Sequence, residues 1–433
     1  MPLLSPIAAI ELIGLIVGST VGCTMLSFPS LTSPLDGNLG QLSTLSMSVF
    51  VFAFLVNLIS GYTIIDCLLP PPSHTSSTVP TSSTAPTSSA SSFSELSSLH
   101  LPPILSPLTG VLSMSVNFAI LTFALHTFPL LFHPLFPSLS FTPNLDVALS
   151  TAVAGLVAYL CTLPTATLSR INASFVNVFF AAYCLLCLDT AGIPSQEAIV
   201  NVADSAAATA AAPADTVITG LKSILPLAVG AGVYQNIIPT VVTGVTASLS
   251  TSTTNTVSTS SQTPVSTSSV RLWSKTLVTV AGLVPLLMYG AWCQVENYHT
   301  LPSFLDAQSI LQHVPTVGFG PKDVFKTAVV GSSSVGCVIG LAKEFEHFLS
   351  TEVYADDVDC DVSPTPAAGC EGLNARDVAL AVVPALVLAN LMTLSGEEGG
   401  ALAMIGMTST VAVPMLYGVV PIMVKKVVDK KGE

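Results

Sequence analysis

The sequence predicts an all-α membrane protein with about ten transmembrane helices. Half of the 433 residues are hydrophobic, only 9% are charged, and the mean hydropathy is +0.73. Apolar runs long enough to cross a bilayer recur along the whole chain. This composition excludes a water-soluble domain, in which about a quarter of the residues are charged.

Ten candidate spans follow one another along the chain, with boundaries that sequence reasoning places only within a few residues. They cover residues 8–29, 43–69, 107–132, 146–164, 172–193, 219–243, 275–296, 324–349, 377–394 and 399–424. The ninth span is short.

Three connectors between the spans have unusual compositions. Residues 70–98 and 250–269 are rich in Ser and Thr, and we predict that both are disordered because neither can bury an apolar core. Residues 352–376 form an acidic loop that contains Asp356 and Asp357. We interpret this loop as a solvated connector, with a cation site or a partner site as the alternative.

The basic residues predict that both ends of the chain face the cytoplasm, or the equivalent compartment of an organelle. With the N-terminus inside, only Lys222, Lys322 and Lys326 of the twelve basic residues fall on the opposite side. We therefore expect a multi-pass protein of the plasma membrane or of an organelle membrane. Its first span is expected to insert as an uncleaved anchor, since no basic segment precedes it.

Two apolar segments are interrupted by glycine and proline at corresponding places in the two halves of the chain. The first runs from Gly14 to Pro29 and the second from Leu225 to Pro239. Unpaired backbone groups at membrane depth persist only where protein or a water-filled cavity satisfies them. Such a pair of interrupted helices is typical of the binding site of a secondary transporter.

The first interruption predicts a site for the carboxylate of a substrate, because exposed N–H groups and the positive end of a helix dipole favour an anion. The alternative is close helix packing through small residues four apart. The candidate residues are Gly18, Ser19, Thr20, Gly22, Cys23 and Thr24.

The second interruption predicts the complementary half of the site. Its freed carbonyl groups can hold an α-ammonium group, and an aromatic ring there can contact the substrate side chain. Alternatively, the ring belongs to an interfacial aromatic belt and the amides join neighbouring helices. The candidate residues are Gly230, Gly232, Tyr234, Gln235 and Asn236.

A cation site is predicted where the carbonyl of Val21 meets the hydroxyls of Ser332, Ser333 and Ser334 in the eighth span. Oxygen ligands suit hard cations. The alternative is that each hydroxyl bonds to the carbonyl one turn back on its own helix. We predict no further metal site and no cofactor.

Several segments resemble the aromatic amino acid permeases, the tyrosine and tryptophan transporters. The residues from Gly18 to Pro29 are similar to the first-helix pattern of that family. Further similar segments follow in the same order, at residues 170–172, 225–239, 283–294 and 333–341.

This resemblance implies the amino acid–polyamine–organocation fold, in which two inverted repeats of five helices have broken first and sixth helices. The repeats correspond here to residues 8–193 and 219–424. The resemblance also implies proton-coupled uptake of large neutral or aromatic amino acids.

The chain departs from the family pattern at three positions. Gln235 replaces a histidine and cannot titrate, Lys343 followed by Glu344 occupies an aspartate position, and Thr24 replaces a glycine. Other ionisable residues lie near span ends, and no carboxylate in the middle of a span stands out as a proton carrier. The coupling ion therefore stays open between a proton and sodium.

We predict a secondary active transporter of amino acids that is not an enzyme. A channel is disfavoured because no ring of polar residues recurs, and a hydrolase because no nucleophile with a base is evident. The expected partners are an amino acid, the coupling proton or sodium ion, and the lipid bilayer, with no nucleic acid. A transporter-like sensor without transport activity is the remaining alternative.

Overall fold

The computed structural model describes most of the helical regions of the chain. The described residues are 4–21, 44–69, 92–133, 142–191, 225, 228–230, 233–254, 266–299, 320–353, 373–396 and 400–432. All regular structure within these ranges is helical, which confirms the predicted all-α class.

Eight helices of the described ranges are long and apolar enough to cross a membrane, and α1 is a shorter apolar helix. The bounds are α1 Pro6–Thr20, α3 Thr44–Leu68, α4 Phe93–His100, α5 Leu105–Leu130, α6 Pro143–Cys161, α7 Thr165–Ala191, η2 Gln235–Ile237, α10 Ile238–Thr254, α11 Thr267–His299, α13 Pro321–Val353, α14 Ala375–Ser395, α15 Gly400–Pro414, η3 Met415–Val419 and α16 Val420–Gly432. The protein is therefore an integral multi-pass membrane protein.

Local sequence explains where several helices begin. Ser5, Ser92, Thr142 and Asn374 precede α1, α4, α6 and α14, and each side chain accepts a hydrogen bond from a backbone N–H of the first turn. These bonds satisfy donors that have no partner inside the helix. In α1 and α6, proline follows the capping residue directly and contributes its preset φ angle.

The structure describes the start of the first interrupted segment and both sides of the second. Helix α1 ends at Thr20, inside the window predicted for the first break, and the residues from 22 to 43 lie outside the described ranges. In the sixth span, Ala228–Gly230 is helical, Val233 and Tyr234 are not, and a short 3-10 turn leads into α10. The predicted interruption of the sixth helix is confirmed.

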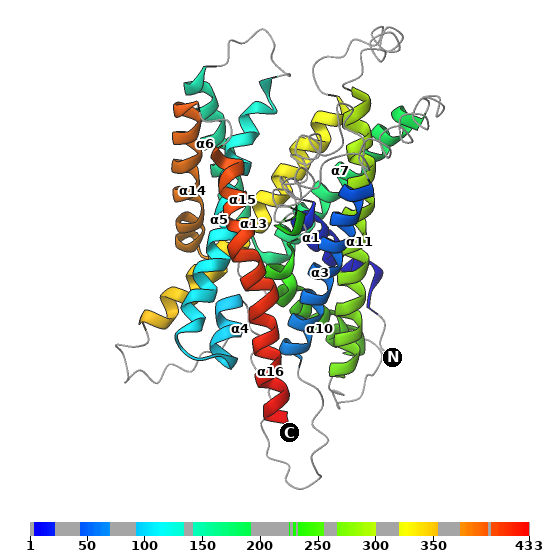
Figure 1. Ribbon diagram of the computed structural model, residues 1–433, viewed down its shortest axis with the longest axis vertical. Helices are drawn as coiled ribbons and strands as arrows, with labels where there is room; N and C mark the ends of the chain where they lie inside the picture. Colours follow the sequence, from blue (N-terminus) through cyan, green and yellow to red (C-terminus); the bar gives the residue numbers. More distant parts are fainter. Residues whose placement is uncertain are drawn as a thin grey trace, which may run out of the picture.

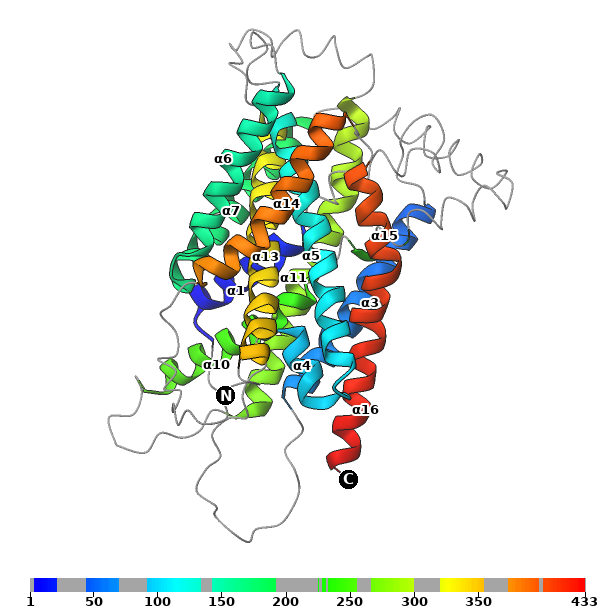
Figure 2. The same ribbon diagram turned by 90° about the vertical axis from the view of Figure 1, so that its left-hand side faces the viewer.

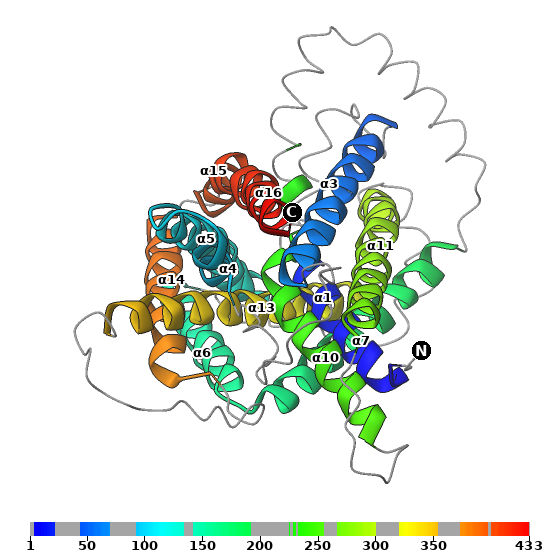
Figure 3. The same ribbon diagram turned by 90° about the horizontal axis from the view of Figure 1, so that it is seen from below.

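The helices form two groups that are joined along α13. One group contains α1, α3, α10 and α11, and the other contains α5, α6, α13 and α14. Helix α13 contacts α1 and α7 as well as its own group, and in the view from below it crosses the middle of the molecule (Figure 3). Corresponding helices of the two chain halves thus lie together, as expected for two repeats.

The ends of several elements lie on the same side of the bundle. Helices α4 and α10 and the end of α16 occupy its lower end in two perpendicular views, whereas α6 lies near its upper end (Figures 1 and 2). Helix α10 continues the sixth span downward from its break.

Parts of both Ser/Thr-rich connectors are helical. Helix α10 runs to Thr254 and α11 begins at Thr267, so the predicted disorder of residues 250–269 is wrong at both ends. Helix α4 begins at Phe93, although residues 70–98 were predicted to be disordered, and this prediction is wrong for residues 92–98. The reason is that Phe93 and Leu96 are both buried against the bundle, which repays the ordering entropy of this short helix.

Candidate functional site

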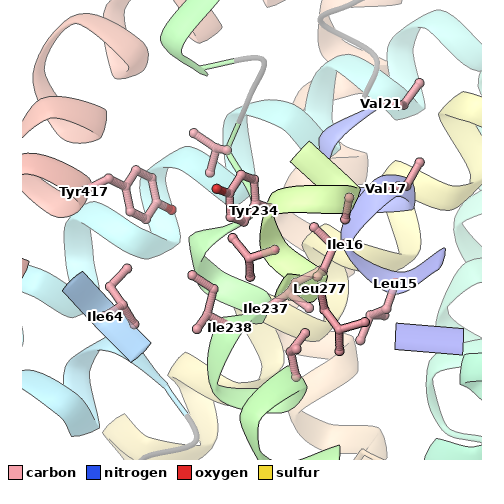
Figure 4. Close-up of a cluster of buried hydrophobic side chains, with 14 of the residues drawn as sticks. Leu15, Ile16, Val17, Val21, Ile64, Tyr234, Ile237, Ile238, Leu277 and Tyr417 are labelled. Carbon is pink, nitrogen blue, oxygen red and sulfur yellow. The ribbon is translucent and has the colours of Figure 1, made fainter. Parts of the chain in front are cut away.

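Helix α13 brings the two interrupted segments together. Gly336 lacks a side chain, and a Cβ atom built there lies 3.5 Å from Cβ of Ser19 and 3.8 Å from Cδ1 of Ile237. The end of α1 and the start of the η2–α10 segment therefore approach α13 at one point. Figure 4 shows that side chains of both segments, including Val17 and Ile238, enter one buried cluster.

The first candidate segment is held by a polar contact among three helices. Ser332 of α13 donates a hydrogen bond of 2.7 Å to Oδ1 of Asn172 on α7, and Nδ2 of Asn172 donates to the carbonyl of Gly14 on α1. A Cβ atom at Gly18 overlaps Oγ of Ser332 and lies 2.9 Å from Nδ2 of Asn172. Gly18 therefore serves close packing here.

At the end of α1, the hydroxyls of Ser19 and Thr20 both donate to the carbonyl of Ile16. The backbone N–H of Val21 still bonds to Val17. Gly22, Cys23 and Thr24 lie outside the described residues. The described part of this segment therefore presents carbonyl oxygens, the negative end of the α1 dipole, toward α13.

The interruption of the sixth helix is fastened to α3 by a single asparagine. Nδ2 of Asn57 donates to the carbonyl of Val229, and Oδ1 of Asn57 accepts from Nε2 of Gln235 at 2.8 Å. The hydroxyl of Tyr234 donates to the Asn57 carbonyl. Tyr234 and Gln235 are almost completely buried, so both predicted site residues shape the break from inside the bundle.

Asn236 is the predicted site residue that turns toward the other helix group. Its Nδ2 donates to Oδ1 of Asn117 on α5 at 2.9 Å, while its own Oδ1 is buried without a hydrogen-bond partner among the described residues. Gly340 on α13 leaves room for both amides. An unpaired buried oxygen is costly, and a donor from a ligand would satisfy it.

Gly230 marks the other side of the break, where it lies against Ser409 of α15. Gly232 is outside the described residues. Helix α15 therefore packs against the first half of the sixth span at Ser409.

The candidate cation site shows the local pattern of bonds and one contact beyond it. The hydroxyls of Ser333 and Ser334 donate to the carbonyls of Val329 and Val330, one turn back. Oγ of Ser333 also lies 3.5 Å from the carbonyl of Val21. Val21 and Ser333 therefore lie together, whereas Ser334 bonds to the carbonyl of Val330 on its own helix.

The ionisable residues divide into edge groups and buried groups. Asp66 pairs with Lys275 and Arg271, and Glu11 lies 3.9 Å from the exposed Arg170. By contrast, Glu344 is only 3% exposed within the span Asp323–Leu349. Sequence reasoning noted Glu344 only as the neighbour of Lys343 and did not identify it as a buried carboxyl.

Lys343 points to the other helix group. Its Nζ donates to the hydroxyl of Thr240 on α10 at 3.0 Å. This bond links α13 to the lower half of the sixth span.

Sequence reasoning also missed two amides that the structure places at the site. Asn57 and Asn117 are the amides of the second and third spans, each followed by an apolar residue and lying well inside its span. Isolated polar residues in a membrane helix usually face the interior of the bundle, and that signal was available in the sequence.

Comparison with known proteins supports the fold. The sequence matches no known family profile and no curated protein sequence. Among solved structures, the chain is similar to the manganese transporter of Eremococcus coleocola, with a TM-score of 0.53 at 10% sequence identity. The match covers 97% of this chain and 80% of that chain. The chain thus has the fold of a membrane transporter.

Proposed function

We propose that the protein is a secondary active transporter of neutral amino acids, which binds its substrate between the end of α1 and the break of the sixth helix. The observation that carries this proposal is the convergence of both interrupted segments on Gly336 of α13. Two broken helices that meet in the middle of a bundle provide free backbone groups for a polar ligand.

The chemistry of the described side chains suits a zwitterion. Amides and hydroxyls surround the break, at Asn117, Asn236, Ser333 and Ser19. These groups both donate and accept hydrogen bonds, and the carbonyl end of α1 favours an ammonium group. The resemblance to aromatic amino acid permeases selects large neutral or aromatic amino acids within this class.

A proton gradient is the proposed driving force, and sodium is the second candidate. The approach of Ser333 to the Val21 carbonyl favours sodium, because both are oxygen ligands. The hypothesis of proton coupling is supported by the family resemblance and by the buried carboxyl of Glu344 on α13.

Ligand binding to the purified protein tests the substrate class. Leucine, tryptophan, lysine, glutamate and manganese are each compared by thermal stabilisation, since a ligand that binds only the folded state raises its stability. We expect stabilisation by leucine or tryptophan, and its loss in Asn236→Ala. Stabilisation by manganese without any response to amino acids would overturn the proposal.

Thr408→Ala provides the matched control for Asn236→Ala. Its hydroxyl bonds only to carbonyls of its own helix in the described residues. We therefore expect Thr408→Ala to bind the same amino acids as the unmodified protein.

A further inference from the structure

The carboxyl of Glu344 is buried against the start of a short helix. Oε1 accepts a hydrogen bond of 3.1 Å from the backbone N–H of Phe93, and Oε2 accepts one of 2.5 Å from the hydroxyl of Ser94. Both donors belong to the first turn of α4. An acidic group at a helix N-terminus gains from unpaired N–H groups and from the helix dipole.

Hydroxyl groups from two further elements surround this carboxyl. Helix α5, which carries Ser113, passes close to it, since a Cβ atom built at Gly110 lies 3.7 Å from Oε2 of Glu344. The ring of Tyr417 in the π-helical segment η3 packs edge-on against Phe93, whose N–H binds the carboxyl. The Tyr417 hydroxyl is buried and has no hydrogen-bond partner among the described residues. Single π-helical turns often occur at functional sites. In this one, the Tyr417 hydroxyl can both donate and accept a hydrogen bond close to the buried Glu344 carboxyl.

The carboxyl lies one helical turn from the candidate substrate site. Gly340, which packs against Asn117 and Asn236, precedes Glu344 by four residues on the same face of α13. A second path runs along α5, where Nδ2 of Asn117 donates to the Ser113 carbonyl. A change at the carboxyl can therefore reach the break of the sixth helix through direct contacts.

Glu344 forms no salt bridge with any of the described residues. Helix α5 presents the uncharged Ser113, and η3 presents Tyr417. The charged or titratable residues of α4 are Glu95 and His100, and those of α13 near Glu344 are Lys343, Glu346 and His347. Helix α16 carries Lys425, Lys426, Asp429, Lys430 and Lys431. Of these, Lys343 donates a hydrogen bond to the hydroxyl of Thr240 on α10.

We propose that Glu344 is the proton-binding group that couples transport to a proton gradient. The hydroxyls of Ser94, Ser113 and Tyr417 are its hydrogen-bond partners in the ionised and protonated states. The inference rests on the proposed transport function. It assigns the coupling role that Gln235 cannot fill.

The hydrogen bonds explain how protonation of Glu344 changes the contact between α13 and α4. In the structure both oxygens accept, which is the pattern of a carboxylate. A proton taken from water forms an O–H group on one oxygen, which must then donate. The Phe93 N–H cannot accept it, so the new bond goes to a hydroxyl oxygen of Ser94, Ser113 or Tyr417. Protonation thereby changes how α13 is bonded to α4, and release of the proton to water restores the first pattern.

Glu344→Gln tests the proposal because it preserves size and hydrogen bonding while removing the titration. In proteoliposomes, a gradient of one pH unit supports about tenfold accumulation when one proton accompanies each substrate. We expect the unmodified protein and Glu346→Gln, an exposed control on the same helix, to accumulate an amino acid to this extent. Glu344→Gln should exchange internal for external substrate at an unchanged rate but accumulate none.

Two transport results would overturn the inference. One is accumulation by Glu344→Gln equal to that of the control. The other is loss of exchange as well as accumulation in folded Glu344→Gln, because this shows that the carboxyl is needed for more than coupling.

Infrared spectroscopy provides a measurement that needs no substrate. The carboxylic acid C=O band of Glu344 should appear and disappear with pH in the reconstituted protein, should be absent from Glu344→Gln, and should persist in Glu346→Gln. A spectrum without such a band at any pH that preserves the fold contradicts the inference. If the band titrates but no amino acid is transported, the proposed substrate class is wrong and the proton site stands.

Discussion

Asn57 of α3 and Gln235 of the sixth span are joined by a buried hydrogen bond of 2.8 Å between Oδ1 and Nε2. The same asparagine also holds the Val229 carbonyl, on the other side of the break. One side chain therefore bridges both sides of an interrupted helix and replaces part of its missing backbone bonding.

We predict that Asn57→Ala destabilises the protein by about 1–3 kcal/mol, because the Gln235 amide and the Val229 carbonyl then lose a buried partner. Hydrogen exchange should rise in residues 228–237 before it rises elsewhere. Thr63→Ala on the same helix is the control, since within the described ranges its hydroxyl bonds only to the Ile59 carbonyl. Equal exchange in the two variants would show that Asn57 does not fasten the break.

Gly18→Ala is predicted to destabilise the protein by about 1–3 kcal/mol, the typical effect of overpacking a core. The new methyl group overlaps the Ser332 hydroxyl, which is held by Asn172. Thermal unfolding in detergent measures the effect. Gly155→Ala is the matched control, because no atom of the residues that the structure describes lies within 4 Å of its added Cβ.

The double variant Gly18→Ala, Ser332→Ala separates close packing from other roles of Gly18. Removal of the Ser332 hydroxyl vacates the overlapping position, so we expect part of the lost stability to return. Strictly additive losses in the two variants would contradict this account of the contact.

Lys343→Met is predicted to loosen the lower half of the sixth span. The substitution keeps an apolar stem and removes the bond to Thr240. Hydrogen exchange at the start of α10 should increase, whereas the exposed Lys425→Met should leave it unchanged. Unaltered exchange in both variants would mean that Lys343 contributes nothing to this contact.

Ser333→Ala and Ser334→Ala are predicted to behave alike when uptake is driven by protons. Each hydroxyl bonds to a carbonyl of its own helix, and only Ser333 also approaches Val21. Uptake is measured in buffers with and without sodium. A sodium requirement that Ser333→Ala alone abolishes would assign this position to a cation.

Much of the fold could be predicted from the sequence because membrane spans are long and apolar. The expected span 377–394 corresponds to α14, and the break expected between Gly230 and Asn236 contains the non-helical Val233 and Tyr234. Glycine and proline weaken a helix locally, so this signal lies in the segment itself.

The contacts at the site could not be predicted in the same way. The partners Asn57 and Gln235 are separated by 178 residues, and Glu344 is buried only because α4, α5 and η3 meet there. Such contacts depend on how distant helices pack. The neighbouring elements, and not the local sequence, determine the burial of Glu344.

Uptake of a labelled amino acid into proteoliposomes tests the central claim most directly. A proton gradient and a sodium gradient are imposed separately on vesicles that contain either the unmodified protein or Asn236→Ala. We predict that the unmodified protein accumulates leucine or tryptophan under the proton gradient alone, and that Asn236→Ala does so at least about tenfold more slowly, as expected when a substrate hydrogen bond is lost. Equal uptake by the two proteins would contradict a binding site between α1 and the break of the sixth helix.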